Sequence, residues 1–285
     1  MRRLAVALSV AVLALGATLA GSVAPAEAAS PGWIVTCTYT RSLTQDPIVA
    51  PGPTGRSHSH DFVGNRTTGS TSSYATMRRG ASSCGTKADN ASYWMPSLFR
   101  GNSQVKPAGS YAGRSTRQRS YYRADNLKPG TKIEPFPADL RVVAGNAKAR
   151  NAAENPALGK EIYWGCSENS TGKLTAPPAS CGTGIISLHV GFPNCWNGKL
   201  THKNDTANLR YPSSGVCPTG FTRALPRLIQ RFEYPVGPKT GSVWLASGAT
   251  FTAHADFWNT WDQAALTRLV KRCLTGNVSC GKDPA

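Results

Sequence analysis

The sequence has 285 residues, of which 28 are glycine and 20 proline, and its formal net charge is +17. This length can bury a core of one or two domains, and the glycine and proline content lies below that of a disordered low-complexity chain. These values exclude collagen and bulk disorder. The charged fraction of only 16% and the scarcity of long helical patterns also argue against a coiled coil or an all-helical protein.

The first 29 residues have the pattern of a secretory signal peptide. Arg2 and Arg3 precede an apolar run over residues 4–20, and Ala26-Glu27-Ala28 matches a small-x-small cleavage site. No later segment is long and apolar enough to span a bilayer. We therefore expect residues 30–285 to form a single secreted, extracellular domain. Because the leader carries a net charge of +1, the mature chain keeps +16.

Taken in chain order, the mature part predicts many short strands and one helix. Apolar, β-branched and aromatic runs predict strands at residues 33–39, 93–100, 105–111, 140–144, 161–165, 185–192, 225–234, 243–245 and 250–258. Proline and glycine place residues 46–57 in a loop, whereas apolar residues at helical spacing predict a helix over residues 262–274. The expected fold is mainly β: an antiparallel sandwich or open barrel with long disulfide-stapled loops and a C-terminal helix.

All eight cysteines follow the leader, and an even count in an exported chain predicts four disulfides. The sequence contains no C-x-x-C pair, which argues against a zinc site built from cysteines. Short spacing favours the pairs Cys166–Cys181 and Cys273–Cys280, and the remaining connectivity stays open.

Histidines and aspartates gather in two short motifs. Residues two positions apart on a strand share a face, so His58 pairs with His60 and His254 with Asp256. If the two motifs are neighbours, they form either a transition-metal site or an acid–base pair, with Asp61 as a further candidate carboxylate. The alternative is a set of ordinary hydrogen-bonded histidines. No metal or other cofactor is required by the sequence.

A second cluster combines aromatic, amide and basic side chains, which suits stacking on sugar rings and bonding to hydroxyls. It also fits a turn anchored by a disulfide around a core tryptophan. Its members are Trp196, Asn197, Lys199, His202 and Asp205.

A third region interleaves arginines with tyrosines between residues 111 and 123. Such a surface suits polyanionic glycan or single-stranded nucleic acid. Because no nucleic-acid motif accompanies it, we do not expect a nucleic-acid partner. The sequence also lacks the motifs of serine hydrolases, zincins and nucleotide enzymes.

Several segments together resemble the secreted family called domain of unknown function nineteen-ninety-six (DUF1996). They are DPIVAPGPTGRSHSHDFVG (46–64), ADNASYWMPSLF (88–99), FPNCWNGK (192–199), YPSSGVCPTGF (211–221), ALPRL (224–228) and HADFWNTWDQ (254–263). The resemblance marks the same histidines and aspartates, adds Tyr93 and Trp94, and has Asn197 where many members carry aspartate. It implies one secreted domain and no established activity.

Three functions follow as hypotheses. The first is a hydrolase or lyase that acts on extracellular polysaccharide. In it His58, His60, Asp61, His254 and Asp256 catalyse, Tyr93, Trp94 and the second cluster bind substrate, and the basic charge favours an acidic glycan. The second is a non-catalytic module that binds glycan or cell-wall polymer. The third is a metal-binding protein whose ligands are His58, His60, His254 and Asp256. The oligomeric state is not predicted.

Overall fold

The computed structural model describes residues 30–111, 113–166 and 172–285, and the predicted leader lies outside the described residues. Its largest sheet has six strands in the order β11-β12-β16-β9-β1-β19. In that order they span Ile162–Cys166, Ile185–Gly191, Arg227–Pro235, Gln118–Arg123, Gly32–Cys37 and Ser279–Lys282. All pairs are antiparallel except β1 with β19, which is parallel.

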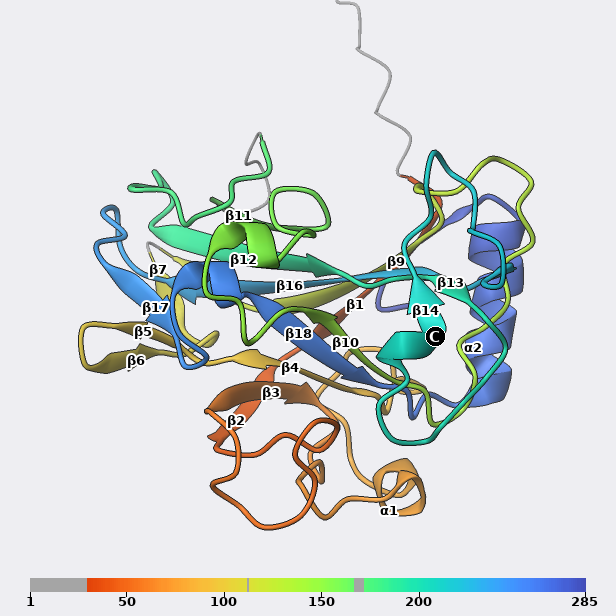
Figure 1. Ribbon diagram of the computed structural model, residues 1–285, viewed down its shortest axis with the longest axis horizontal. Helices are drawn as coiled ribbons and strands as arrows, with labels where there is room; N and C mark the ends of the chain where they lie inside the picture. The colour runs from red at the N-terminus through yellow and green to blue at the C-terminus, as the bar shows by residue number, and fades with distance from the viewer. Residues whose placement is uncertain (1–29, 112, 167–171) are drawn as a thin grey trace, which may run out of the picture.

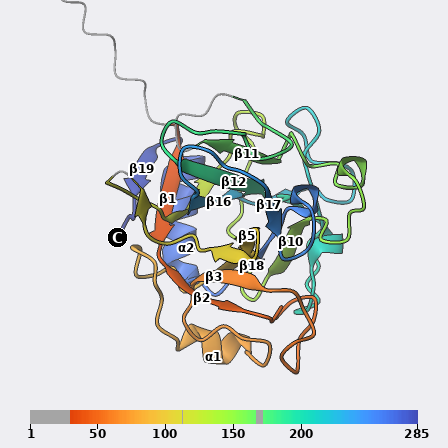
Figure 2. The same cartoon turned by 90° about the vertical axis from the view of Figure 1, so that its left-hand side faces the viewer.

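The second sheet has five antiparallel strands in the order β10-β18-β4-β3-β2. They span Arg141–Gly145, His254–Trp258, Ser92–Pro96, His60–Gly64 and Tyr39–Leu43. Figure 1 shows this sheet below the six-stranded one, and Figure 2 shows β1 passing from the upper layer toward β2 in the lower layer. The described chain is therefore mainly β, as predicted, with several antiparallel sheets and no closed barrel.

Alternating side chains fill the space between the two sheets. Trp33, Tyr122 and Phe232 point inward from the six-stranded sheet, and Tyr93 and Phe257 from the five-stranded sheet; all are buried. Apolar burial of this kind is the main favourable contribution to folding. The described part of the fold is thus a sandwich around one principal core.

Smaller elements extend the edges. The described residues include two three-stranded sheets and one hairpin, β17-β5-β6, β14-β13-β15 and β7-β8. These strands span Val243–Leu245, Leu98–Arg100, Ser103–Val105, Leu209–Arg210, Cys195–Trp196, Arg223–Ala224, Ser110–Tyr111 and Arg114–Ser115. Short helical turns are α1 (Tyr74–Arg78), η1 (Ala152–Glu154), η2 (Thr206–Asn208) and η3 (Thr250–Thr252).

The predicted C-terminal helix is present, because α2 (Gln263–Leu269) begins at the Asp262 cap and continues as the π-helical segment η4 (Val270–Thr275). None of the helices in the described ranges is long and apolar enough to span a membrane. Several strand predictions were too long. The 93–100 strand is divided at Ser97 into β4 and β5, which belong to different sheets. The 250–258 strand starts only at His254, because Thr252 turns back to bond Ala249, and the 105–111 strand is interrupted at Pro107, which lacks a main-chain donor.

Four disulfides connect the described cysteines, which is typical of proteins from an oxidising compartment. The predicted pairs Cys166–Cys181 and Cys273–Cys280 are confirmed. The other two are Cys195–Cys217 and Cys37–Cys84, whose wider spacing gave no preference in the sequence.

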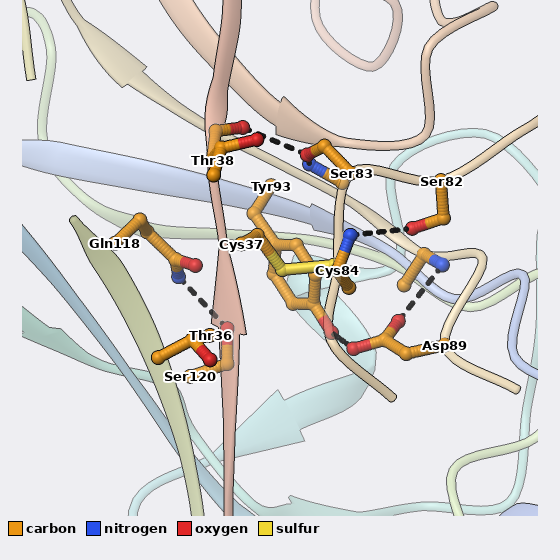
Figure 3. The surroundings of a disulfide bond; sticks show 12 residues. Thr36, Cys37, Thr38, Ser82, Ser83, Cys84, Asp89, Tyr93, Gln118 and Ser120 are labelled. Carbon is orange, nitrogen blue, oxygen red and sulfur yellow. Dashed lines mark hydrogen bonds between the residues drawn. A yellow bond between two sulfur atoms is a disulfide. The ribbon is translucent and has the colours of Figure 1, made fainter. Parts of the chain in front are cut away.

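Figure 3 shows the surroundings of Cys37–Cys84, which ties the end of β1 to residues 82–84. Beside it, the Tyr93 hydroxyl donates to Asp89 Oδ2 at 2.6 Å and contacts the Tyr122 hydroxyl at 2.5 Å. Trp261 Nε1 donates to that same Tyr122 hydroxyl. A buried polar chain therefore crosses the core next to this disulfide.

Candidate metal centre

The two histidine motifs lie on flanking strands of one sheet. His60 in β3 is opposite Pro96 in β4, and Asp256 in β18 is opposite Trp94 in β4. Extending the second register by two residues places His254 opposite Pro96 as well. His60 and His254 thus face each other across the proline of the central strand, on the sheet face away from the principal core. The two motifs are therefore neighbours, as the sequence-based hypothesis required.

A loop brings the third histidine onto the same spot. His58 Nε2 lies 3.2 Å from His254 Nε2. Ring centroids are 4.3 Å apart for His58 and His60, and 5.7 Å apart for His60 and His254. One ligand atom from each of the three imidazoles can be chosen so that all lie within 4.8 Å of one another. His58 is partly exposed, whereas the other two rings are buried.

Backbone carbonyls fix the orientation of the two buried rings. His60 Nδ1 donates to the Gln45 carbonyl, and His254 Nδ1 donates to the Thr252 carbonyl, both at 2.9 Å. In the neutral ring this leaves Nε2 with its lone pair free. Metal-binding histidines are held in the same way by a hydrogen bond on the second nitrogen. The two Nε2 atoms therefore point into the cluster as acceptors.

Carboxylates complete the cluster. Asp46, His60 and Asp256 form a second group whose ligand atoms lie within 4.8 Å of one another. Asp46 is buried, and its Oδ1 accepts from the amides of Ile48 and Val49, which fixes the loop that begins there. Asp46 was not predicted as a site residue from the sequence. Its only local signal was the Asp-Pro pair that starts the loop.

Three buried atoms of the cluster have no hydrogen-bond partner among the described residues. They are His60 Nε2 and both carboxylate oxygens of Asp256. Leaving one buried polar atom unpaired costs on the order of 1–3 kcal/mol, and more for a charged group. A folded protein rarely accepts three such atoms side by side, so this arrangement calls for a bound species.

The local electrostatics fit a cation. Burial lowers the pKa of His254 to about 4 and holds the pKa of His60 well below its usual value, with a further contribution from His58 and His254. Burial also raises the pKa of Asp256 well above its usual value, and the carboxylate of Asp46 adds to that rise. Without a cation, burial thus favours the neutral form of the imidazoles and of the Asp256 carboxyl group.

An apolar shell surrounds the cluster. Phe62 and Trp94 stack at 5.3 Å on the same sheet face, and they pack with Ile48, Met77 and Trp258 into a second buried cluster. Figure 1 shows the chain before β3 and helix α1 beyond β3 on this side of the sheet. Water is therefore largely excluded from the buried side of the centre, and His58 marks the side that is open to solvent.

Other predicted site residues lie elsewhere. Asp61 points to the opposite face of β3, where its Oδ1 accepts from Ser42, Ser97 and Gln104. Tyr93 is fully buried in the principal core and bonded to Asp89. Trp94 borders the His–Asp cluster but is also fully buried. Neither aromatic ring presents a surface on which a sugar can stack.

The Trp196–Asp205 cluster belongs to a separate turn. Asp205 is buried and accepts from Thr201 and the Arg141 amide, and Trp196 is largely buried, with Nε1 donating to the Lys199 carbonyl. Asn197 bonds Asn208 and the Lys199 amide. Arg141, which pairs with Trp258, is four residues along β10 from Gly145, which pairs with His254. This turn therefore lies roughly 13 Å along the strands from the histidines.

His202 and Lys199 are the exposed members of that turn. His202 Nδ1 bonds Asp139 Oδ2 at 3.0 Å, which leaves its ring at the surface and away from the His58–His254 pair. The structure thus brings together four of the predicted residues, His58, His60, His254 and Asp256, and adds Asp46.

Fold and site define a disulfide-bonded β sandwich with a buried histidine–carboxylate centre on the outer face of one sheet. The family model described as Domain of unknown function (DUF1996) matches residues 46–261, so this chain belongs to that family, as its motifs predicted. The match includes all five residues of the centre. Neither a curated protein nor a solved structure matches the chain.

Proposed function

We propose that this domain binds one divalent transition-metal ion through His58, His60, His254 and Asp256, with Asp46 beside them. The observation that carries the proposal is the set of buried acceptors without partners, His60 Nε2 and both Asp256 oxygens. Imidazole and carboxylate together are ligands that suit zinc, copper, iron and manganese.

The hydrogen-bond pattern supports a single ion. The two three-residue groups share His60. Because Nδ1 of His60 is engaged by the Gln45 carbonyl, the ring has only Nε2 to offer and does not bridge two ions. Two carboxylates among neutral imidazoles balance a charge of two, which favours a divalent ion.

Elemental analysis of the purified native protein tests the proposal directly. We expect about one transition-metal ion per chain and a higher melting temperature than for chelator-treated protein, since an ion that binds only the folded state stabilises it. Replacement of His254 by Ala removes one ligand and should weaken metal binding by more than about tenfold. Loss of a residue that only supports a ligand already weakens metal binding by about tenfold or more.

His202→Ala is the matched control, because this histidine is exposed and lies outside the cluster. It should leave metal content unchanged. Native protein with no bound metal, together with no thermal shift on adding zinc, copper, iron or manganese salts, would contradict the proposal.

A second proposal for the same residues is cleavage of an extracellular polysaccharide by a hydrolase or lyase mechanism. What supports it is the partly exposed ring of His58, which connects solvent to His254 Nε2. Asp256 would act as acid or base, with His60 or His254 as its partner. Asp61, the other carboxylate predicted for this role, points to the opposite face of β3 and does not reach these histidines. The burial of these carboxylates favours the metal proposal instead.

Screening acidic and neutral glycans separates the two proposals. Turnover by chelator-treated protein that is lost in Asp256→Asn supports the acid–base reading. No turnover of any glycan by wild-type protein, with or without added metal, argues against it.

A further inference from the structure

A rigid turn displays two lysines far from the histidine centre. Lys128, Pro129, Gly130 and Thr131 form a tight turn in which the Thr131 amide and hydroxyl donate to the Lys128 carbonyl, at 3.2 and 2.7 Å. Gly130 has φ +80°, and proline followed by such a glycine is typical of a type II turn. Lys128 and Lys132 are exposed at either end of this turn.

The turn is anchored on both sides. Leu127 and Ile133 are buried in the principal core, and the Lys128 amide donates to the Gly215 carbonyl at 3.0 Å. The backbone that carries the lysines is therefore preorganised, so ligand binding pays little entropy for ordering this loop.

The turn forms one wall of a cavity of about 740 Å³. Lys128 and Lys132 line it, together with Leu274 and Thr275 at the end of η4 and Asn277 just beyond it. Figure 1 shows the yellow-green segment near residue 130 beside the upper end of the helix. Lys271 and Arg272, both exposed, precede these η4 residues by about one turn of the helix.

The acidic groups of this region are already engaged by arginines. Asp125, which also lines the cavity, pairs with Arg227 at 2.9 Å, and Glu134 next to the turn accepts from Arg223 Nε at 3.0 Å. In the described part of the chain, neither Lys128 nor Lys132 forms a salt bridge, although the charge of Lys132 contributes, with Arg223, to lowering the pKa of Glu134. The cavity thus keeps an excess of positive charge in a chain that already carries +17.

We propose that this cavity, which we call the lysine cavity, binds anionic groups of an extracellular polymer such as an acidic polysaccharide or a phosphate-bearing wall polymer. The two cationic side chains on this preorganised turn bind repeated negative charges, and the cations of η4 extend the contact along the polymer. This proposal is independent of the metal centre, because none of the residues that line the lysine cavity belongs to the five-stranded sheet that carries the histidines.

Binding to sodium polygalacturonate and to inorganic polyphosphate tests the proposal and separates carboxylate from phosphate. Wild-type protein should bind at least one of them, with a Kd that rises with added salt, and should not bind neutral dextran. Lys128→Gln combined with Lys132→Gln should weaken that binding about tenfold. The Arg pair, Lys128→Arg with Lys132→Arg, should retain it, because the charge remains.

The matched control is Lys87→Gln combined with Lys148→Gln, two exposed lysines outside the cavity. It makes the same change in net charge and should alter Kd by less than about twofold, since each contributes only to the distant field. Equal losses in the two Gln pairs would overturn the proposal in favour of net charge alone. Wild-type protein that binds neither polymer at low salt would overturn it as well.

Discussion

Gly145 is the residue on which the position of His254 depends most directly. It has φ +97°, and a Cβ placed there would lie 2.4 Å from the Ala253 carbonyl oxygen and 2.8 Å from His254 Cα. Backbone atoms at such distances must move apart. The strand that carries the histidine would have to shift with them.

Gly145→Ala should therefore weaken metal binding as well as stability. Strain at such a position costs on the order of 1–3 kcal/mol, and the shift of His254 adds a loss of affinity measurable by metal titration. Gly220→Ala is the control, with φ +82° but open space around the new methyl group. It should lower the melting temperature modestly and leave metal affinity alone; equal losses of affinity in both variants would contradict this explanation.

Asp89 gives the buried polar chain a dependence on pH. Burial raises its pKa to about 7, and the nearby Asp283 carboxylate contributes in the same direction, while the Tyr93 hydroxyl and the Ala91 amide oppose the rise. The hydroxyl of Tyr122 is the next group along the chain. The folded protein therefore keeps this proton between about pH 4 and 7, whereas the unfolded chain releases it.

From this we expect Asp89 to lower the free energy of unfolding by about 1.4 kcal/mol per pH unit as pH rises from about 4 to 7. Denaturant unfolding of wild type and Asp89→Asn across this range measures the difference. The stability of wild type relative to the variant should fall with rising pH and level off above pH 7. A difference that is constant from pH 4 to 8 would show that Asp89 does not titrate in this way.

At this scale the sequence predicted strand faces better than long-range contacts. The His-x-Asp spacing correctly placed His254 and Asp256 on one face of β18, since alternation is a local property of a strand. His58 lies in the loop before β3, so strand alternation does not explain its place beside His60. Asp46 was missed because its partner Asp256 is 210 residues away, and nothing local indicates such a contact. Tyr93 was predicted to bind substrate, and its burial in a hydrogen-bonded network was not predicted, because a tyrosine in a strand satisfies its hydroxyl equally well at a surface or in the core.

Among the elements, the segment before β3 combines rigidity with exposure. It begins at the buried Asp46, has exposed residues around Pro53 and Gly55, and returns at His58. One end holds a carboxylate and the other an imidazole of the same centre. A metal ion bound there would therefore fasten both ends of this loop to the sheet.

This connection predicts a protease footprint. Cleavage after Arg56, the exposed arginine of the loop, should be slower in metal-loaded than in chelator-treated protein, because the ion restricts the opening of both loop ends. Limited trypsin digestion followed by mass spectrometry measures the rate at this bond. Cleavage after the exposed Arg79, outside the loop, is the internal control and should not change. Equal rates at Arg56 in the two forms would rule out this fastening.

The Cys37–Cys84 bridge acts at the level of elements too, since it fastens β1 to a segment that precedes β4. Replacing both cysteines by alanine should lower the free energy of unfolding by about 2–4 kcal/mol. Denaturant unfolding checks this value, and the Cys273→Ala/Cys280→Ala pair, which closes a much shorter loop, should cost less. A larger loss in the second pair would contradict the dependence on loop length.

Periodicity located most strands to within a few residues and the C-terminal helix almost fully. It did not reveal that residues 250–252 turn before β18 or which strands are neighbours. Strand order in this fold follows from contacts across the principal core, and the pairing of β1 with β9, β16 with β9 and β18 with β4 joins segments that are distant in sequence. Local patterns carry no information on such pairings.

At the scale of the whole molecule, the first and last described strands are neighbours in the six-stranded sheet. β19 pairs in parallel with β1, and beyond it Asp283 accepts from the Thr36 amide at 2.7 Å. Removal of residues 279–285 should lower the free energy of unfolding by roughly 2–4 kcal/mol more than the Cys273→Ala/Cys280→Ala pair alone, because it also removes these bonds. Thermal or denaturant unfolding of both variants measures this difference, and equal stabilities would refute it.

The pairing of β1 with β19 also bears on how the protein is made. A chain that is made from its N-terminus displays β1 long before residues 279–282 exist, so the edge of β1 that pairs with β19 stays open until those residues have been made. Exposed edges invite pairing with other chains. Before β19 exists, β1 has two partners: it pairs with β9, and its Cys37 forms a disulfide with Cys84. Formation of this disulfide would thus hold β1 in the sandwich and reduce its pairing with other chains before β19 is present.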